Sequence, residues 1–266
     1  MLRAVPRSLL MTFFGAFLRR LGGWIAVADL VALMGDLDLE EQAVRSAVSR
    51  LKRRGVIAAE RRGGAAGYRL TPHGLAILEA GDARIFGRDD GDGGSGDWVL
   101  VVFSIPEERR ALRHRLRTRL QWLGLGTVAA GVWIAPAHAE AEVRRTIQEL
   151  DLSGHVDLFR GDHLGAAAAV AAWWDLDAIA AEYRAYVDAW EPALRTDGRR
   201  PAGAGAFAGQ VRQLDAWRRV PFHDPGLPAL VLPGDWPGAH AWDVFRALDR
   251  RLSRPALRHV EARVGR

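Results

Sequence analysis

The sequence predicts an α+β protein with several domains, and three observations support this class. In the N-terminal part, short amphipathic helical patterns are followed by a glycine-rich hairpin pattern. In the middle part, strand and helix patterns alternate after a stretch of glycine and aspartate. The remainder has mostly helical periodicity. At 266 residues the chain is long enough for two or three domains, each with a hydrophobic core of its own.

Charge is distributed unevenly along the chain. The net charge is +5, and residues 1–86 carry all of this surplus, because the charges of residues 87–266 cancel. A local positive surplus is the electrostatic footprint expected of a segment that binds an anionic polymer. The chain has no cysteine, which excludes disulfides and cysteine-ligated zinc. No stretch predicts a membrane helix or a cleaved signal peptide, so we expect a cytoplasmic protein with no membrane partner.

The first helical patterns cover Ser8–Leu21 and Ala28–Met34, with a short extended piece at Trp24–Val27 between them. A third helix is predicted from Asp38 to Gly55. Asp38 is expected to be its N-cap, in a capping box with Glu41, and Gly55 is expected to end it.

The third helix has two chemically different faces. Its apolar residues follow helical spacing and predict a buried stripe, formed by Val44, Ala47, Val48 and Leu51. The opposite face mixes arginines with short polar side chains, a combination suited to close approach to phosphates and base edges. We predict that this face contacts DNA through Gln42, Arg45, Ser46, Ser49, Arg50 and Arg53.

A hairpin pattern follows this helix. Two short strands flank the glycine-rich segment 63–67, and Thr71-Pro72 opens another helix. Helices joined by a tight turn and followed by a basic hairpin predict a winged helix-turn-helix domain over residues 1–87. The hairpin arginines Arg61, Arg62 and Arg69 are expected to contact the DNA backbone. The alternative is that this domain docks a protein partner instead of DNA.

The middle part begins after a predicted linker at residues 88–97. Strands are predicted at Trp98–Ile105, Leu125–Val128, Val132–Ala135 and Val156–Phe159, and helices after Pro106 and at Ala139–Leu150. The order βαββαβ predicts a ferredoxin-like domain over residues 98–164. The first of these helices has an outer face rich in arginine, formed by Arg109, Arg110, Arg113, Arg115, Arg117 and Arg119.

An enzymatic alternative is a metal-dependent nuclease built on the middle domain. Such a nuclease needs carboxylates gathered at strand ends to hold a divalent cation. Here the first strand runs into Ser104, and the eight histidines lie at no metal-ligand spacing. We therefore predict that the protein is not an enzyme and has no metal site and no cofactor.

Residues 165–266 are predicted to form a helical domain for ligand binding and dimerisation. Helices are expected at Trp173–Trp190, Ala206–Val220 and Ala239–Ser253, with a loop at Arg195–Gly205. This part is rich in tryptophan. These tryptophans either fill a core or line a pocket for a planar ligand.

Several stretches, in the same order along the chain, resemble the PaaX family of repressors of phenylacetic acid degradation. They include Pro6–Leu10, Ala43–Leu51, Tyr68–Gly74, Gly131–Pro136 and Leu232–Gly238. The resemblance implies a homodimeric repressor of a catabolic operon that binds double-stranded DNA at a palindromic operator. It also implies release from the operator by an aryl-acetyl-CoA effector such as phenylacetyl-CoA or another acyl-CoA.

Two positions depart from the family pattern. Ser104 stands where members often carry an aspartate, which argues against a metal-dependent nuclease. Asp215 stands where a histidine is common, two residues before the Trp217-Arg218 pair, which puts binding of the usual effector in doubt. For an acyl-CoA we expect aromatic side chains around the acyl group and arginines at the phosphates. The candidate effector residues are Trp173, Trp174, Arg184, Trp190, Trp217, Arg218 and Arg219.

Overall fold

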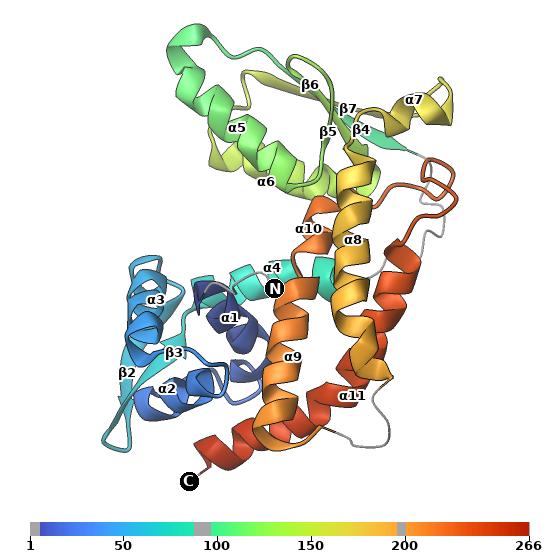
Figure 1. Cartoon of the computed structure of the whole chain (residues 1–266). Coiled ribbons are helices and arrows are strands. Elements are labelled where there is room, and N and C mark those ends of the chain that lie inside the picture. Colours follow the sequence, from blue (N-terminus) through green and yellow to red (C-terminus); the bar gives the residue numbers. More distant parts are fainter. Residues whose placement is uncertain (1–5, 88–96, 196–200, 266) are drawn as a thin grey trace. The chain divides into compact units, whose positions relative to one another are not determined.

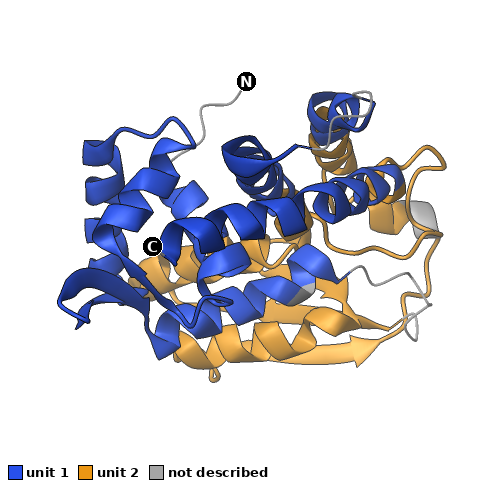
Figure 2. Cartoon of the chain, turned by 90° about the horizontal axis from the view of Figure 1, so that it is seen from below, with its two compact units in different colours: residues 1–87, 186–218, 240–266 blue, residues 88–185, 219–239 orange. Residues whose placement is uncertain are grey.

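The computed structural model describes residues 6–87, 97–195 and 201–265 and contains two antiparallel sheets among many helices (Figure 1). The predicted α+β class is therefore confirmed. The chain divides into two compact units, coloured separately in Figure 2. Unit 1 comprises residues 1–87, 186–218 and 240–266, and unit 2 comprises residues 88–185 and 219–239.

The N-terminal part of unit 1 combines helices with a three-stranded sheet. α1 continues into a π-helical turn at Phe14–Leu18, and the sheet has the strand order β1-β3-β2. The elements are α1 (Pro6–Phe13), β1 (Trp24–Ala26), α2 (Val27–Gly35), α3 (Glu41–Arg53), β2 (Ile57–Arg62), β3 (Ala65–Leu70) and α4 (Pro72–Phe86).

Glycines shape the hairpin of β2 and β3. Gly63 and Gly64 both have positive φ, which a two-residue type I′ turn requires and which suits the right-handed twist of the strands. In β3, a Cβ atom on Gly67 would lie 2.5 Å from the carbonyl oxygen of Ile25 and from the ring of Trp24. Only glycine permits this close approach of β3 to β1.

The core of unit 1 is assembled from both ends of the chain. The predicted stripe of α3 is buried, as Val44, Ala47, Val48 and Leu51 are all at most 4% exposed. These residues share one apolar cluster with side chains of α9 (Gly203–Trp217) and α11 (Gly238–Val264). The C-terminal contributions are Phe207, Ala208, Val211, Ala256 and Val260. Helices from the C-terminal third therefore support α3.

The predicted capping box at Asp38 is wrong. α3 begins at Glu41, and Asp38 has a φ of 59° in the loop before it. The Asp38 carboxylate accepts a hydrogen bond from Arg212 Nη2 of α9 at 2.5 Å. A contact with a residue distant in sequence thus replaces the local cap.

The last predicted helix is longer than the sequence indicated. α11 passes through Pro255 and ends at Val264, whereas the prediction ended at Ser253. Burial of Ala256 and Val260 in the core of unit 1 stabilises the turns beyond the proline. Residues 196–200 of the predicted loop lie outside the described residues, and Gly203–Gly205 belong to α9.

Unit 2 contains a four-stranded antiparallel sheet with the order β5-β6-β4-β7. Its elements are β4 (Trp98–Phe103), α5 (Arg110–Trp122), β5 (Gly126–Ala129), β6 (Val132–Pro136), α6 (Glu140–Glu149) and β7 (Val156–Gly161). Leu116 and Leu120 of α5 and Val143 of α6 are buried against Val99 and Val101 of β4. These helices therefore cover the same face of the sheet.

A tryptophan packs against the end of β5. Gly126 lies so close to the indole of Trp174 that a Cβ would approach the ring to 2.7 Å, and Trp174 Nε1 donates to the carbonyl oxygen of Gly124 at 2.8 Å. The helices α7 (Ala167–Ala171), α8 (Leu176–Trp190) and α10 (Val220–His223) follow in the chain.

The predicted domain limits stay predictions. Residues 88–96 of the predicted linker lie outside the described residues. Residues 165–266, which we expected to form one helical domain, contribute to both units: 165–185 and 219–239 to unit 2, and 186–218 and 240–266 to unit 1.

Candidate nucleic-acid interface

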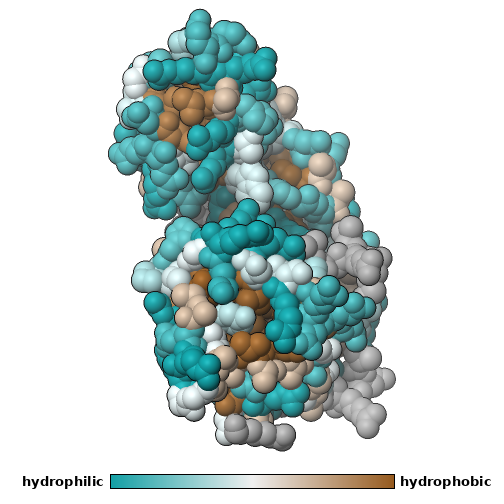
Figure 3. Space-filling view, turned by 90° about the vertical axis from the view of Figure 1, so that its left-hand side faces the viewer, coloured by the Kyte–Doolittle hydropathy of each residue, from teal (hydrophilic) through white to brown (hydrophobic). Residues whose placement is uncertain are grey.

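The outer face of α3 carries all six polar residues that the sequence predicted for it. Because the apolar stripe is buried, helical spacing turns these residues outward, and each of them is exposed. They line a shallow hollow of about 420 Å³, formed by Gln42, Arg45, Ser46, Ser49, Arg50 and Arg53. Figure 3 views the molecule from the side on which α3 and β2 lie in Figure 1, and hydrophilic residues cover much of this face.

The arginines of α3 differ in their partners. Arg45 forms an exposed ion pair with Glu41, one turn earlier in the helix, at 2.5 Å. Arg50 and Arg53 have no hydrogen-bond or ion-pair partner among the residues that the structure describes. Two guanidinium groups of the hollow are therefore available to an external anion.

The hairpin arginines are held by local contacts. One carboxylate, that of Glu60, pairs with Arg62 at 2.5 Å and with Arg69 at 2.8 Å. Arg61 donates to the carbonyl oxygen of Gly64 at 2.7 Å, and the guanidinium of Arg62 lies 5.5 Å from the centre of the Trp24 ring. The carboxylate of Glu60 thus neutralises part of the positive charge of the hairpin.

Arg7 of α1 adds to the positive charge beside α3. Burial, together with the charges of Arg54, Arg50 and Arg218, lowers the pKa of the Arg7 guanidinium from its ordinary value. Arg7 was not among the residues predicted for this surface. No signal within α1 indicates the proximity, which results from the packing of α1 against α3.

A buried carboxylate joins α1 to α9 behind this surface. Asp215 is 2% exposed, and its Oδ1 accepts hydrogen bonds from Ser8 Oγ at 2.6 Å and from Thr12 Oγ1 at 2.9 Å. Arg218 Nε donates to the same oxygen at 3.2 Å, and its Nη2 donates to Ser8 Oγ at 2.8 Å. Arg218, predicted to bind an effector, therefore has a structural role at this joint.

The predicted effector residues fall into both units, and those of unit 2 are Trp173, Trp174, Arg184 and Arg219. Trp173 lies edge-on to His163, with ring centres 5.3 Å apart, and Trp174 packs against Gly126. Arg184 pairs with Asp235 at 3.2 Å on the surface.

The effector residues of unit 1 are Trp190, Trp217 and Arg218. Trp217 is 2% exposed and stacks on Phe245, with ring centres 4.7 Å apart and 9° between the planes. Its Nε1 donates to the carbonyl oxygen of Ile85 at 2.9 Å. Trp217 is therefore a core residue, whereas Trp190 is half-buried at the end of α8.

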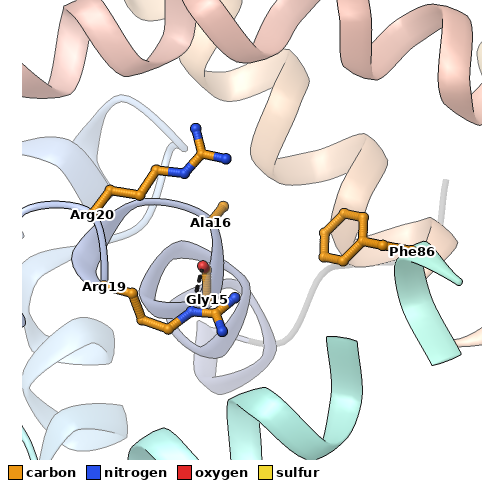
Figure 4. A pocket seen from close by; sticks show the side chains of 5 residues that line it. All are labelled: Gly15, Ala16, Arg19, Arg20 and Phe86. Atoms are coloured by element: carbon orange, nitrogen blue, oxygen red, sulfur yellow. Dashed lines mark hydrogen bonds between the residues drawn. The ribbon is translucent and has the colours of Figure 1, made fainter. Parts of the chain in front are cut away.

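Unit 1 also has a small hollow of about 280 Å³ beside the π-helical turn, shown in Figure 4. Arg19 folds back along the turn, where its Nε donates to the carbonyl oxygen of Gly15 at 3.0 Å and its Nη atoms bind both oxygens of Asp82. Arg20 extends away from the turn, and Phe86 approaches from α4. This hollow was not predicted from the sequence.

Two further kinds of feature are absent from the described residues, a metal-binding cluster and a membrane-spanning helix. Within them, no group of three or more histidine and acidic side chains has an arrangement able to hold a metal ion. No helix in the described part of the chain combines the length and the apolar character that a membrane span requires.

Comparison with known proteins gives consistent matches along the chain. Family models match residues 5–74 ("PaaX-like protein"), residues 92–172 ("PaaX protein central Cas2-like domain") and residues 174–262 ("PaaX-like protein C-terminal domain"). The Transcriptional repressor PaaX of Escherichia coli (strain K12) is 27% identical over 269 residues, covering 97% of this chain and 84% of that protein.

Among solved structures, the chain is similar to the uncharacterized protein Rv0674 from Mycobacterium tuberculosis. The TM-score is 0.63 with 24% sequence identity, and the match covers 97% of this chain and 98% of the other. At this identity the likeness concerns the fold alone.

Proposed function

The chain belongs to the PaaX family of regulators, and on this premise we propose that it is a DNA-binding transcriptional repressor. Residues 1–87 act as a winged helix-turn-helix, with α3 as the recognition helix in the major groove. The hairpin of β2 and β3 is the wing, and Arg61, Arg62 and Arg69 contact the phosphate backbone. Arg7 and Arg54 add positive charge at the same surface.

One observation carries this proposal: the outer face of α3 has two exposed arginines without partners among the described residues, set between short polar side chains. Arginine reads guanine through two parallel hydrogen bonds, whereas serine and glutamine read base edges at short range. A helix face that only contacts solvent does not require unpaired arginines alternating with short polar side chains next to a basic hairpin.

Replacement of Arg50 by alanine tests the proposal. The operator is first isolated by selecting genomic fragments that the purified protein binds. Arg50→Ala should then abolish the footprint on this fragment, because a bidentate base contact contributes about 1–3 kcal/mol and Arg50 also supplies charge. The matched control is Lys52→Ala, which removes a cation of the same helix that lies outside the hollow. An intact Arg50→Ala footprint would remove α3 as the reader.

We further propose that the repressor is a homodimer that binds a palindromic operator of a phenylacetate-type catabolic operon. Two recognition helices related by a two-fold axis read half-sites about one helical turn of DNA apart, or a multiple of this. Sedimentation of the free protein measures the dimer, and the footprint measures the spacing. A monomer that protects a single asymmetric site would contradict both statements.

For regulation, we propose that an aryl-acetyl-CoA or another acyl-CoA releases the repressor from DNA. The ligand must bind the released state more tightly than the DNA-bound state. Trp173 and Trp190 are better candidates for ligand contact than Trp217, because core packing already accounts for the burial of Trp217. Tryptophan fluorescence with a panel of CoA thioesters tests this, with Trp173→Phe and Trp190→Phe as reporters. The absence of a response to any thioester would refute it.

We also propose that residues 98–164 form a ferredoxin-like domain and that residues 165–266 serve ligand binding and dimerisation. The antiparallel order β5-β6-β4-β7 supports the first statement. Such a fold hosts many functions, so it adds no activity by itself.

A further inference from the structure

α5 of unit 2 has an unusual composition for a surface helix. Its 13 residues, Arg110–Trp122, include five arginines and a histidine but no aspartate or glutamate. Over residues 87–266 as a whole, positive and negative charges cancel. The positive charge of α5 is therefore a local feature of unit 2.

Helical spacing separates these cations from the core. Leu116 and Leu120 are buried against the sheet, and the opposite face carries Arg110, His114 and Arg117 at positions i, i+4 and i+7. Arg115 flanks this row. All four side chains belong to exposed residues. We call Arg110, His114, Arg115 and Arg117 the α5 stripe.

The arginines of α5 fall into two groups by their contacts. Arg113 pairs with Glu107 at 2.6 Å, and Arg119 lies 3.8 Å from Glu149. Arg110, Arg115 and Arg117 have no hydrogen-bond or ion-pair partner within the described ranges. The paired arginines lie outside the stripe, and the unpaired ones lie within it.

The stripe receives no ion pair from within α5, because this helix has no acidic residue. Arg110 directly follows a 3₁₀ turn, Glu107–Arg109, and the two glutamates of this turn are the acidic residues nearest to it in sequence. The neighbouring α6 has the ordinary arrangement, with Glu140 and Glu142 in its first turn and Arg144 paired with Glu140.

We propose that the α5 stripe is a second DNA-binding surface, which contacts backbone phosphates without reading sequence. This inference rests on the proposed function, since a DNA-binding repressor brings the polyanion that the stripe would neutralise. The rise of an α-helix places Arg110 and Arg117 about 10 Å apart along the axis. That length corresponds to about three phosphate steps of one DNA strand. Long arginines facing solvent suit phosphates, which carry the contacts that position a protein on DNA.

The salt dependence of binding tests the stripe. The double variant Arg110→Gln/Arg117→Gln removes two cations and keeps good helix formers. The logarithmic salt slope should fall by about 0.9 for each lost phosphate contact, so by roughly 2 in total. Between 50 and 200 mM salt, the unmodified protein should therefore lose about tenfold more affinity than the double variant. A random-sequence duplex and the selected operator fragment should give the same difference.

The control is Arg144→Gln, which removes one arginine of unit 2 that already pairs with Glu140. Its slope should equal that of the unmodified protein, and thermal unfolding should show that all variants fold. A double variant with an unchanged slope would overturn the inference and leave the proposed function standing. If the unmodified protein bound neither duplex at any salt concentration, the proposed function and the inference would fall together.

Discussion

α3 and α5 are both helices of 13 residues with a basic outer face above a buried apolar stripe. They differ in what lies between the arginines. On α3, the spaces between the arginines are occupied by uncharged polar side chains, those of Gln42, Ser46 and Ser49. These side chains are shorter than arginine and can form hydrogen bonds close to the helix surface. On α5, the exposed face carries more cationic side chains, Arg110, His114, Arg115 and Arg117, with Thr118 and Gln121 as its uncharged polar residues. The first surface suits base edges, and the second suits phosphates.

The two helices also differ in what supports them. Every residue of the core beneath α5 comes from residues 99–158, a continuous stretch of chain. The core beneath α3 includes Phe207, Val211, Ala256 and Val260 from the C-terminal third. A change in α9 or α11 can therefore reach the proposed DNA reader directly, which is the coupling that a ligand-controlled repressor needs.

The largest effect is expected from Phe207→Ala. This side chain is fully buried between Phe13 and Phe17, with ring centres 6.1 and 5.6 Å away. Its removal should lower the free energy of unfolding of unit 1 by about 3–5 kcal/mol. Hydrogen exchange measured by mass spectrometry should become faster in α3, although Phe207 lies in α9.

The matched change in unit 2 is Leu116→Ala. It should cost a comparable free energy, about 2–5 kcal/mol, and should speed exchange in α5 while leaving α3 unchanged. If Phe207→Ala left exchange in α3 at its original rate, the two helices would not differ in their support.

A somewhat smaller loss is expected from Asp215→Ala. The substitution leaves Arg218 without its carboxylate and removes the acceptor for Ser8 and Thr12, at a cost of about 3 kcal/mol. Denaturant unfolding measures this loss. Asp188→Ala makes the same chemical change at an exposed position of unit 1 and should cost less than about 0.5 kcal/mol. Equal effects of the two substitutions would show that the joint between α1 and α9 contributes no stability.

Local signals explain which parts of the fold could be predicted from the sequence. The hairpin followed from glycines at 63 and 64 between β-rich strands, and the buried stripe of α3 followed from the spacing of Val44, Ala47, Val48 and Leu51. The outward direction of the six polar residues on α3 depends on the same spacing.

Contacts between distant residues explain the failures. Asp38 has the sequence signature of an N-cap, but its carboxylate binds Arg212 instead. Local patterns could not reveal this contact, because Arg212 lies 174 positions away in the sequence. α11 continues past Pro255 because the core of unit 1 extends to Val260. Within the candidate site, Glu60 and Arg62 lie two residues apart on the same strand, whereas the pairing of Glu60 with Arg69 of β3 depends on the hairpin register, which the alternation of residues does not determine.

Glu60→Gln tests whether the arginines of the wing add to DNA binding by unit 1 without affecting which sequence α3 reads. It releases Arg62 and Arg69 from a shared carboxylate and makes the hairpin more positive by one charge. Affinity for random-sequence DNA at low salt should rise about fivefold, the equivalent of roughly 1 kcal/mol, while footprint boundaries stay unchanged. Glu79→Gln, at an exposed site of α4, should leave affinity within about twofold. Weaker binding by Glu60→Gln would mean that Glu60 orients the arginines for DNA rather than masking them.

The smallest effect is expected from Glu41→Gln, which acts on the single ion pair within α3. Both partners are more than half exposed, so the loss of the pair and of a favourable charge at the helix N-terminus should cost about 0.5 kcal/mol. Release of Arg45 should raise affinity for the operator about twofold. Glu140→Gln breaks the i,i+4 pair with Arg144 in α6 and a longer contact, 3.7 Å, with Arg160. It should cost a similar free energy of unfolding but leave operator affinity unchanged, because α6 is not part of the proposed recognition surface. Equal shifts in affinity from both variants would indicate a general effect of net charge. They would contradict the proposal that release of Arg45 in α3 specifically strengthens operator binding.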